Sequence, residues 1–190
     1  MLLLGPQGSG KGTQAKRIEA EYGIPHIATG DMLRAAIGDA SELGRRVKPI
    51  LESGQLVPDE LMIDLIRERL EQPDAEGGFI LDGFPRTAPQ ADALDAMLEE
   101  IGRPLSIVFE VQVPDEIARE RLLRRSELEG RADDTPEVIG RRLDLYHELT
   151  EPLVEHYRLQ GNLVGIRGDR PVNEVFAEIQ EALEQAAARS

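Results

Sequence analysis

The first thirteen residues combine four glycines, a lysine and a threonine with an apolar triplet, in the order Met-Leu-Leu-Leu-Gly-Pro-Gln-Gly-Ser-Gly-Lys-Gly-Thr. The leucines form a continuous apolar run, which predicts a short buried strand. Apolar residues then recur at helical spacing at Ala15, Ile18 and Tyr22. Glycine allows a sharp turn and a close approach to a ligand. Because a helix N-terminus directs backbone N–H groups and a positive dipole end at one point, the segment predicts a phosphate-binding loop.

The segment Gly5–Lys11 matches the G-x4-G-K pattern of the P-loop, with one departure just beyond it. The strict pattern has Ser or Thr directly after the lysine, whereas here Gly12 precedes Thr13. An ordinary strand-to-helix turn is the alternative, since chance alone produces the pattern in roughly one chain of this length in twenty. The strand before the loop and the helix after it favour the phosphate site.

A second candidate group, Asp82-Gly-Phe-Pro-Arg86, follows an apolar run at residues 79–81. In open α/β sheets, ligands bind at the carboxyl ends of parallel strands. We therefore predict that Asp82 helps to hold Mg²⁺ through water, as such aspartates do beside a P-loop, and that Arg86 faces the same crevice. The alternative is a turn with a solvent-exposed arginine.

Arginine is far more abundant than lysine, with 19 Arg against 3 Lys. Arginine binds phosphate oxygens in pairs and keeps its charge, and phosphoryl transfer depends mainly on positioning and charge neutralisation. For any single arginine, a surface ion pair with one of the 36 acidic residues is the alternative. The three histidines (His26, His147 and His156) are scattered, and we interpret them as structural. Arginines at predicted loops or helix ends are Arg34, Arg86, Arg121, Arg125, Arg131 and Arg142.

Composition narrows the class of protein. The net charge of −14 argues against a nucleic-acid or anionic-membrane partner. Cysteine is absent, which excludes a disulfide framework and Cys-ligated zinc. The longest stretch without a charged residue is residues 1–10, which is too short to cross a bilayer. We therefore expect a cytoplasmic protein.

Apolar runs alternate with helical patterns along the chain, which predicts a parallel sheet with helices on both faces. Residues 29–70 show helical spacing without an intervening strand, so we expect an excursion from the sheet there. Residues 125–134 are polar and predict a surface loop, after which Thr135 and Pro136 begin a helix that Pro152 should kink. The predicted strands are 2–4, 24–28, 79–81, 107–113 and 163–166.

Taken together, five segments resemble the motifs of the adenylate kinase family, in that family's order and spacing over essentially the whole chain. These segments are Gly5–Thr13, Thr29–Arg34, Gln55–Asp59, Asp82–Arg86 with Gln90, and Gly130–Asp134. The resemblance implies one kinase domain over residues 1–190. Its α/β fold would be of the three-layer P-loop NTPase type with a five-stranded parallel sheet. Residues 28–57 would form a helical AMP-binding subdomain and residues 124–134 a short lid.

The resemblance also implies roles for individual residues. ATP would be bound by Gly8, Ser9, Gly10, Lys11, Gly12, Thr13, Arg121, Arg125 and Arg170. AMP would be bound by Thr29, Gly30, Arg34, Gln55, Leu56, Val57, Gly83, Phe84, Pro85, Arg86, Gln90, Arg131 and Arg142. The catalytic set would be Lys11, Arg86, Arg125, Arg131 and Arg142. No residue would bind metal directly, because Asp82 would reach Mg²⁺ through water.

The implied activity is reversible phosphoryl transfer from MgATP to AMP, giving two ADP. The resemblance further implies a cytoplasmic monomer without a nucleic-acid or membrane partner, and the short lid without cysteine excludes the zinc-bearing long lid of some members. Gln90 is predicted to read adenine, because a carboxamide offers a donor and an acceptor together; a helix-capping role is the alternative. One departure is Arg167, which stands where the family has an acidic residue before Gly168.

Three other functions are alternatives. A UMP/CMP kinase shares the loop and the turn after Asp82, but Gln90 and Gln55–Val57 favour adenine. A non-catalytic adenine-nucleotide sensor would bind ATP without forming ADP. A regulatory GTPase needs an N-K-x-D motif, whereas neither Asn162 nor Asn173 is followed by lysine.

Overall fold

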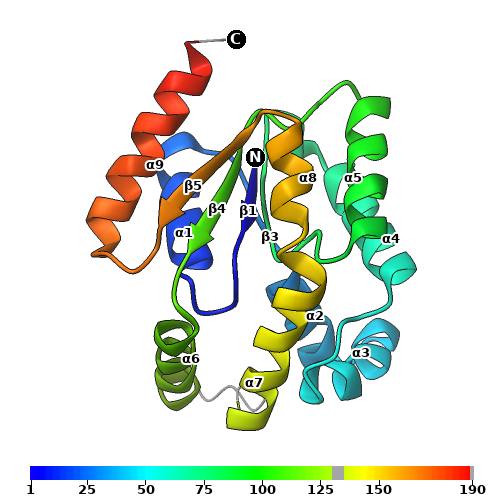
Figure 1. The fold of residues 1–190 in the computed structure, drawn as a ribbon. Helices are drawn as coiled ribbons and strands as arrows, with labels where there is room; N and C mark the ends of the chain where they lie inside the picture. Colours follow the sequence, from blue (N-terminus) through cyan, green and yellow to red (C-terminus); the bar gives the residue numbers. More distant parts are fainter. Residues whose placement is uncertain (130–134, 189–190) are drawn as a thin grey trace.

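Five parallel strands form the centre of the protein in the computed structural model, which describes residues 1–129 and 135–188 (Figure 1). The strand order in the sheet is β2-β3-β1-β4-β5. The predicted strands are therefore confirmed, with ends that differ by up to two residues. Their bounds are β1 Leu2–Leu4, β2 His26–Ala28, β3 Ile80–Asp82, β4 Val108–Gln112 and β5 Leu163–Arg167.

Strand β1 lies at the middle of the sheet and is paired on both sides. Leu2 is in register with Leu81 of β3 on one side and with Val108 of β4 on the other. After β1 the chain forms β2 and β3 on one side of it and then β4 and β5 on the other side. This reversal of direction makes the carboxyl edge next to β1 a topological switch point. The loops that follow β1 and β3 consequently meet at one crevice.

Helices cover both faces of the sheet, as the near-continuous apolar strands require. Leu2 and Leu4 belong to a core shared with α4 (Asp59–Leu70), α5 (Ala88–Glu100) and α8 (Leu153–Leu159). Leu3 points the other way, into a core shared with α1 (Lys11–Tyr22) and α9 (Val172–Ala187). Figure 1 shows these two helical layers on either side of the sheet. The three-layer α/β prediction is confirmed.

The helical excursion predicted between β2 and β3 consists of α2 (Thr29–Gly38) and α3 (Glu42–Glu52), followed by α4 and the short 3-10 helix Pro73–Ala75. Ser41 caps α3, because its side chain accepts a hydrogen bond from the backbone N–H of Gly44 at 3.0 Å. Figure 1 shows α2 and α3 at the carboxyl edge of the sheet, across from α6 (Asp115–Glu129).

The surface loop predicted over residues 125–134 is wrong for residues 125–129, which belong to α6, and its remaining residues 130–134 lie outside the described residues. The helical region 136–159 is divided into three pieces. As predicted, Thr135 caps α7 (Pro136–Leu145) by accepting a hydrogen bond from the N–H of Val138. A π-helical turn at Tyr146–Thr150 then separates α7 from α8. The N–H of Glu151 donates to the carbonyl of Tyr146 at 2.8 Å, a five-residue span that widens the helix just before Pro152. A π-helical turn thus lies just before the proline at which the sequence predicts a kink.

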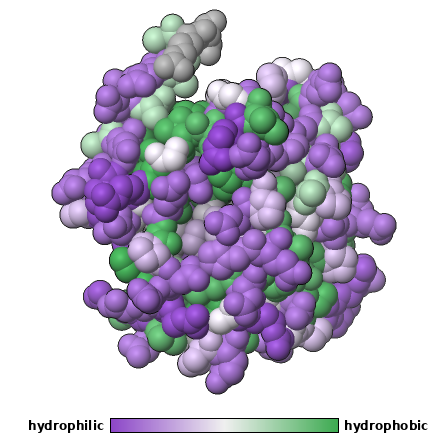
Figure 2. Space-filling model, in the orientation of Figure 1, coloured by the Kyte–Doolittle hydropathy of each residue, from purple (hydrophilic) through white to green (hydrophobic). Residues whose placement is uncertain are grey.

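The face seen in Figure 2 is mostly hydrophilic, with hydrophobic residues visible among the hydrophilic ones. In the part of the chain that the structure describes, no helix has the length and apolarity needed to cross a membrane.

Candidate active site

The loop between β1 and α1 packs tightly against its neighbours. Gly8 has a φ of +84°, and a Cβ added there would lie 2.4 Å from the carbonyl oxygen of Ala118 in α6. Only glycine fits this conformation and this close approach. Lys11 folds back over the loop, since its Nζ donates to the carbonyl oxygens of Gly5 at 2.6 Å and Pro6 at 2.8 Å. The loop is therefore held in shape around the lysine.

Lys11 is buried, and its surroundings disfavour its positive charge. Burial is the main cause that lowers the pKa of Lys11 to about 8; the charge of Asp82 opposes this shift, and the charges of Arg86 and Arg125 contribute to it. A buried ammonium beside two guanidinium groups favours a bound anion. The site is thus arranged to bind negative charge.

Asp82 is the carboxylate at the base of this group. His26, at the start of β2, places its Nε2 3.2 Å from Oδ2 of Asp82. Burial by itself raises the pKa of Asp82, but the hydrogen bond from His26 and the charges of Lys11 and Arg86 outweigh it and hold that pKa below its usual value. Asp82 is therefore ionised at neutral pH.

The turn after β3 fixes Arg86. Gly83 has a φ of +85°, and an added Cβ would lie 2.7 Å from the hydroxyl oxygen of Thr29. Arg86 Nε donates to the Gly83 carbonyl at 2.7 Å, and the Thr150 hydroxyl donates to the Arg86 carbonyl at 2.9 Å. Burial, followed by the charge of Arg142, lowers the pKa of Arg86 to about 10. The guanidinium is thus rigidly held and stays charged at neutral pH.

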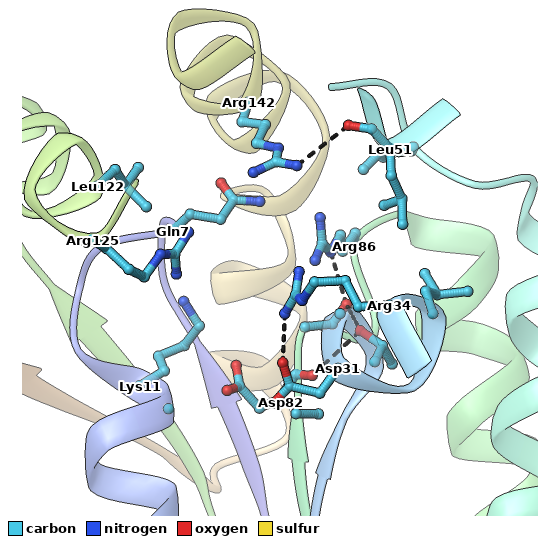
Figure 3. Close-up of a pocket in the computed structure, with 18 of the residues that line it drawn as sticks. Gln7, Lys11, Asp31, Arg34, Leu51, Asp82, Arg86, Leu122, Arg125 and Arg142 are labelled. Atoms are coloured by element: carbon cyan, nitrogen blue, oxygen red, sulfur yellow. Dashed lines mark hydrogen bonds and ion pairs between the residues drawn. The ribbon is translucent and has the colours of Figure 1, made fainter. Parts of the chain in front are cut away.

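Cationic side chains from separate elements surround a single cavity of about 490 Å³. Figure 3 shows Lys11, Arg34, Arg86, Arg125 and Arg142 pointing into it above Asp82. They come from α1, α2, the turn after β3, α6 and α7, so the predicted convergence of arginines is present. The predicted site residues that line the cavity are Gly8, Gly10, Lys11, Gly12, Thr13, Thr29, Gly30, Arg34, Gln55, Leu56, Val57, Asp82, Gly83, Arg86, Gln90, Arg121, Arg125 and Arg142.

Other predicted site residues lie elsewhere. Pro85 borders a smaller neighbouring cavity of about 80 Å³, and Phe84 is buried in the core. Ser9 belongs to the loop and is buried, with its hydroxyl 3.3 Å from Lys11 Nζ. Arg170 forms an ion pair with Glu178 and does not border the cavity. Arg131 lies outside the described residues.

Two arginines, one on α6 and one at the end of β5, have contacts that the sequence did not predict. Arg121 Nη1 donates to the Gly168 carbonyl at 2.9 Å and contacts the carbonyls of Gly8 and Ser9, so it ties the loop after β5 to the glycine-rich loop. Arg167, the departure from the family pattern, pairs with Asp169 at 2.9 Å and is exposed. Its side chain therefore faces solvent.

Sequence reasoning missed some residues that line the cavity. His26 was interpreted as structural, but it contacts Asp82. Gln7 reaches the cavity next to Arg125 in Figure 3, and its Oε1 is buried without a hydrogen-bond partner among the described residues. Asp31 pairs with Arg34 at 2.5 Å. The i, i+3 spacing was a usable signal for Asp31, whereas His26 is brought to Asp82 only by the pairing of β2 with β3.

The residues in the cavity fit a magnesium ion that is bound mainly by a ligand. Among the described residues, no group of three or more His, Cys, Asp or Glu side chains is placed to hold a metal. Mg²⁺ usually keeps several waters and takes one or two carboxylates plus substrate phosphates. Asp82 and Thr13 both border the cavity beside the glycine-rich loop and suit that role.

A glycine-rich loop leading from a central parallel strand into a helix, beneath a cationic cavity, defines an α/β protein of the P-loop class. The family model for adenylate kinase matches residues 3–162. The chain is 50% identical over 185 residues to an adenylate kinase of Cyanothece sp., covering 97% of this chain and 95% of that protein. It is 49% identical to one of Micrococcus luteus (96% and 89% covered) and 42% identical to one of Methanosarcina barkeri (98% and 99% covered). The chain belongs to the adenylate kinase family.

Proposed function

We propose that this protein transfers a phosphoryl group reversibly from MgATP to AMP, forming two ADP. The observation that carries the proposal is the convergence of Lys11, Arg34, Arg86, Arg125 and Arg142 on one cavity at the end of the glycine-rich loop. Two nucleotides that meet end to end bring many negative charges to one place, and a cluster of fixed cations matches them. The family resemblance further supports a monomer acting in the cytoplasm.

Each side of the cavity takes one nucleotide in this proposal. The glycine-rich loop with Arg121 and Arg125 binds ATP, and the segment 28–57 with Arg86 and Gln90 binds AMP. Arg170 joins the ATP side at the adenine, on the resemblance alone. Residues 124–134 close over ATP as a short lid, and Arg131 and Arg142 reach the phosphates. Such closure excludes water and so protects ATP from hydrolysis.

The chemistry needs little from the protein besides position and charge. The attacking atom is a phosphate oxygen of AMP, which is already anionic, so no general base is required. Charge accumulates on the transferring group, and Lys11 and the arginines stabilise it there. Asp82, through water, and Thr13 would hold Mg²⁺ on the ATP phosphates. When bound, the ion neutralises charge on the phosphate oxygens.

A coupled assay for ADP tests this function directly. The purified protein with MgATP is given AMP, UMP, CMP or GMP in turn, and we expect ADP formation to be fastest with AMP. A higher catalytic efficiency with UMP or CMP would assign the protein to pyrimidine nucleotides. Nucleotide binding without ADP formation from ATP and AMP would make it a sensor.

The lowered pKa of Lys11 predicts a pH dependence. Lys11 is charged below its pKa of about 8 and loses its charge as the pH rises through that value. We therefore expect kcat/KM for ATP to fall above pH 8, where the phosphates are already ionised because their second pKa is about 6. With saturating nucleotides, the phosphate charges raise the pKa of Lys11, so the fall in kcat should move to higher pH. Steady-state rates between pH 7 and 10 measure both, and a flat kcat/KM profile would contradict the prediction.

A further inference from the structure

Two hydrogen bonds hold the side-chain amide of Gln90 from opposite ends. Gln90 is buried in the first turn of α5 and borders the cavity. Its Oε1 accepts a hydrogen bond from the backbone N–H of Arg86 at 2.8 Å. Its Nε2 donates to Oδ1 of Asp59, the first residue of α4, at 2.7 Å.

These two partners leave the amide a single orientation. A backbone N–H can only donate, so the atom facing Arg86 must be the amide oxygen. An ionised carboxylate can only accept, so the atom facing Asp59 must be the amide nitrogen. Turning the amide over would set donor against donor at one end and acceptor against acceptor at the other. Asp59 is therefore one of two groups that determine which way the amide faces.

A third contact ties Asp59 to the same helix end. The Thr87 hydroxyl donates to Oδ1 of Asp59 at 2.9 Å and accepts from the backbone N–H of Gln90 at 3.4 Å, as the N-cap of α5. Asp59 also follows Val57, which lines the cavity, by two residues. One carboxylate oxygen thus joins a cavity-lining segment, the α5 cap and the Gln90 side chain.

We propose that Asp59 is a positioning residue for base selection, which acts by holding the Gln90 amide in the orientation that suits adenine and opposes guanine. This inference rests on the proposed function, in which Gln90 reads the base of AMP. A carboxamide has two N–H donors and two acceptor positions, so one of each remains after the bonds to Asp59 and Arg86. Adenine presents an amino donor beside a ring acceptor, whereas guanine presents a carbonyl beside a ring N–H.

The discrimination between AMP and GMP therefore depends on Asp59 as well as on Gln90. When the amide is locked in one orientation, its donor faces an acceptor of adenine and its acceptor faces a donor. With guanine, the same amide sets donor against donor and acceptor against acceptor. An amide that is free to turn over can match guanine as well. Asp59 therefore acts chiefly against GMP, by preventing the orientation that would accept it.

A purely structural role for Asp59 is the rival explanation. A negative side chain in the first turn stabilises a helix through the helix dipole, and Glu60 in the same turn of α4 provides that effect too. Glu60 is exposed. Glu60→Gln is thus a matched control, because it removes the same charge from the same turn without touching Gln90.

The experiment measures kcat/KM for AMP and for GMP in single and double variants. We expect Asp59→Leu to narrow the AMP:GMP ratio about fivefold, the equivalent of one hydrogen bond, through a higher KM for AMP and better use of GMP. Asp59→Asn keeps an acceptor for the amide and should restore most of the ratio. Gln90→Leu should narrow the ratio about tenfold. In that background, Asp59→Leu should cause no further change, because Asp59 acts through Gln90.

The outcomes separate the two proposals. An unchanged ratio in Gln90→Leu would remove Gln90 as the base reader, and with it the role of Asp59. If Gln90→Leu narrows the AMP:GMP ratio but Asp59→Leu leaves it unchanged, only the Asp59 inference is overturned. The same conclusion follows if Glu60→Gln narrows the ratio as much as Asp59→Leu does, or if the effects of Asp59→Leu and Gln90→Leu add in the double variant. Thermal melting checks that each variant is folded. If Asp59→Leu fails that check, Asp59→Ser, which is too short to reach the Gln90 amide, takes its place.

Discussion

Replacement of Lys11 by methionine should lower kcat by about a thousandfold or more, equivalent to about 4 kcal/mol of transition-state stabilisation. Lys11 Nζ folds back onto the glycine-rich loop, where the charges of Asp82, Arg86 and Arg125 act on it. Methionine keeps an unbranched side chain of similar length but has no charge to place on the transferring phosphoryl group. Steady-state kinetics with saturating MgATP and AMP measure the loss.

The control for this variant is another lysine. Lys48 is exposed and lies 3.9 Å from Glu52 on the surface of α3, so Lys48→Met should leave kcat within a factor of about two, as surface changes usually do. Lys11 also donates to the carbonyls of Gly5 and Pro6, so the melting temperature of each variant must be compared. A folded Lys11→Met protein that kept more than about a tenth of wild-type activity, a change below about 1.4 kcal/mol, would disprove the assigned role.

Exchange of Arg86 for lysine should lower kcat/KM for AMP by about a hundredfold, although the charge is conserved. Arg86 is held through its own Nε, which bonds the Gly83 carbonyl, and through its backbone carbonyl, which accepts from Thr150. This leaves a planar guanidinium in a fixed place for paired hydrogen bonds to phosphate oxygens. A lysine ammonium is a single point charge on a flexible stem and cannot reproduce that fork.

Arg67→Lys is the matched control for this exchange. Arg67 lies on the exposed surface of α4 and pairs with Glu100 at 3.4 Å, so the same chemical change there should have no effect on kcat/KM. A parallel measurement of KM for ATP locates the defect, because Arg86 is assigned to AMP. A loss confined to ATP would move Arg86 to the other nucleotide.

The strands, their order and most of the helices were predictable from local sequence, but the extension of α6 through residues 125–129 was not. Short unalternated apolar runs and helical spacing identified all five strands and the helix after the glycine-rich loop, because backbone geometry and burial on both faces impose those patterns on neighbouring residues. The loop, Asp82 and the Thr135 cap were predictable for the same reason, since each depends on contacts within a few residues. The observed strand ends differ from the predicted ends by up to two residues, because pairing with another strand decides where a strand stops.

Tertiary structure alone decided which side chains line the cavity, how deeply they are buried, and what their pKa values and orientations are. The contacts Asp59–Gln90, His26–Asp82 and Arg121–Gly8 join residues that are 31, 56 and 113 positions apart. Ser9, Phe84 and Pro85 belong to the predicted motifs, yet the turns direct them toward the core or a neighbouring cavity. Motifs specify the backbone that approaches a ligand, but burial, pKa and side-chain orientation depend on every element packed around a group. The lowered pKa of Lys11 and the fixed amide of Gln90 are therefore properties of the folded chain and not of its motifs.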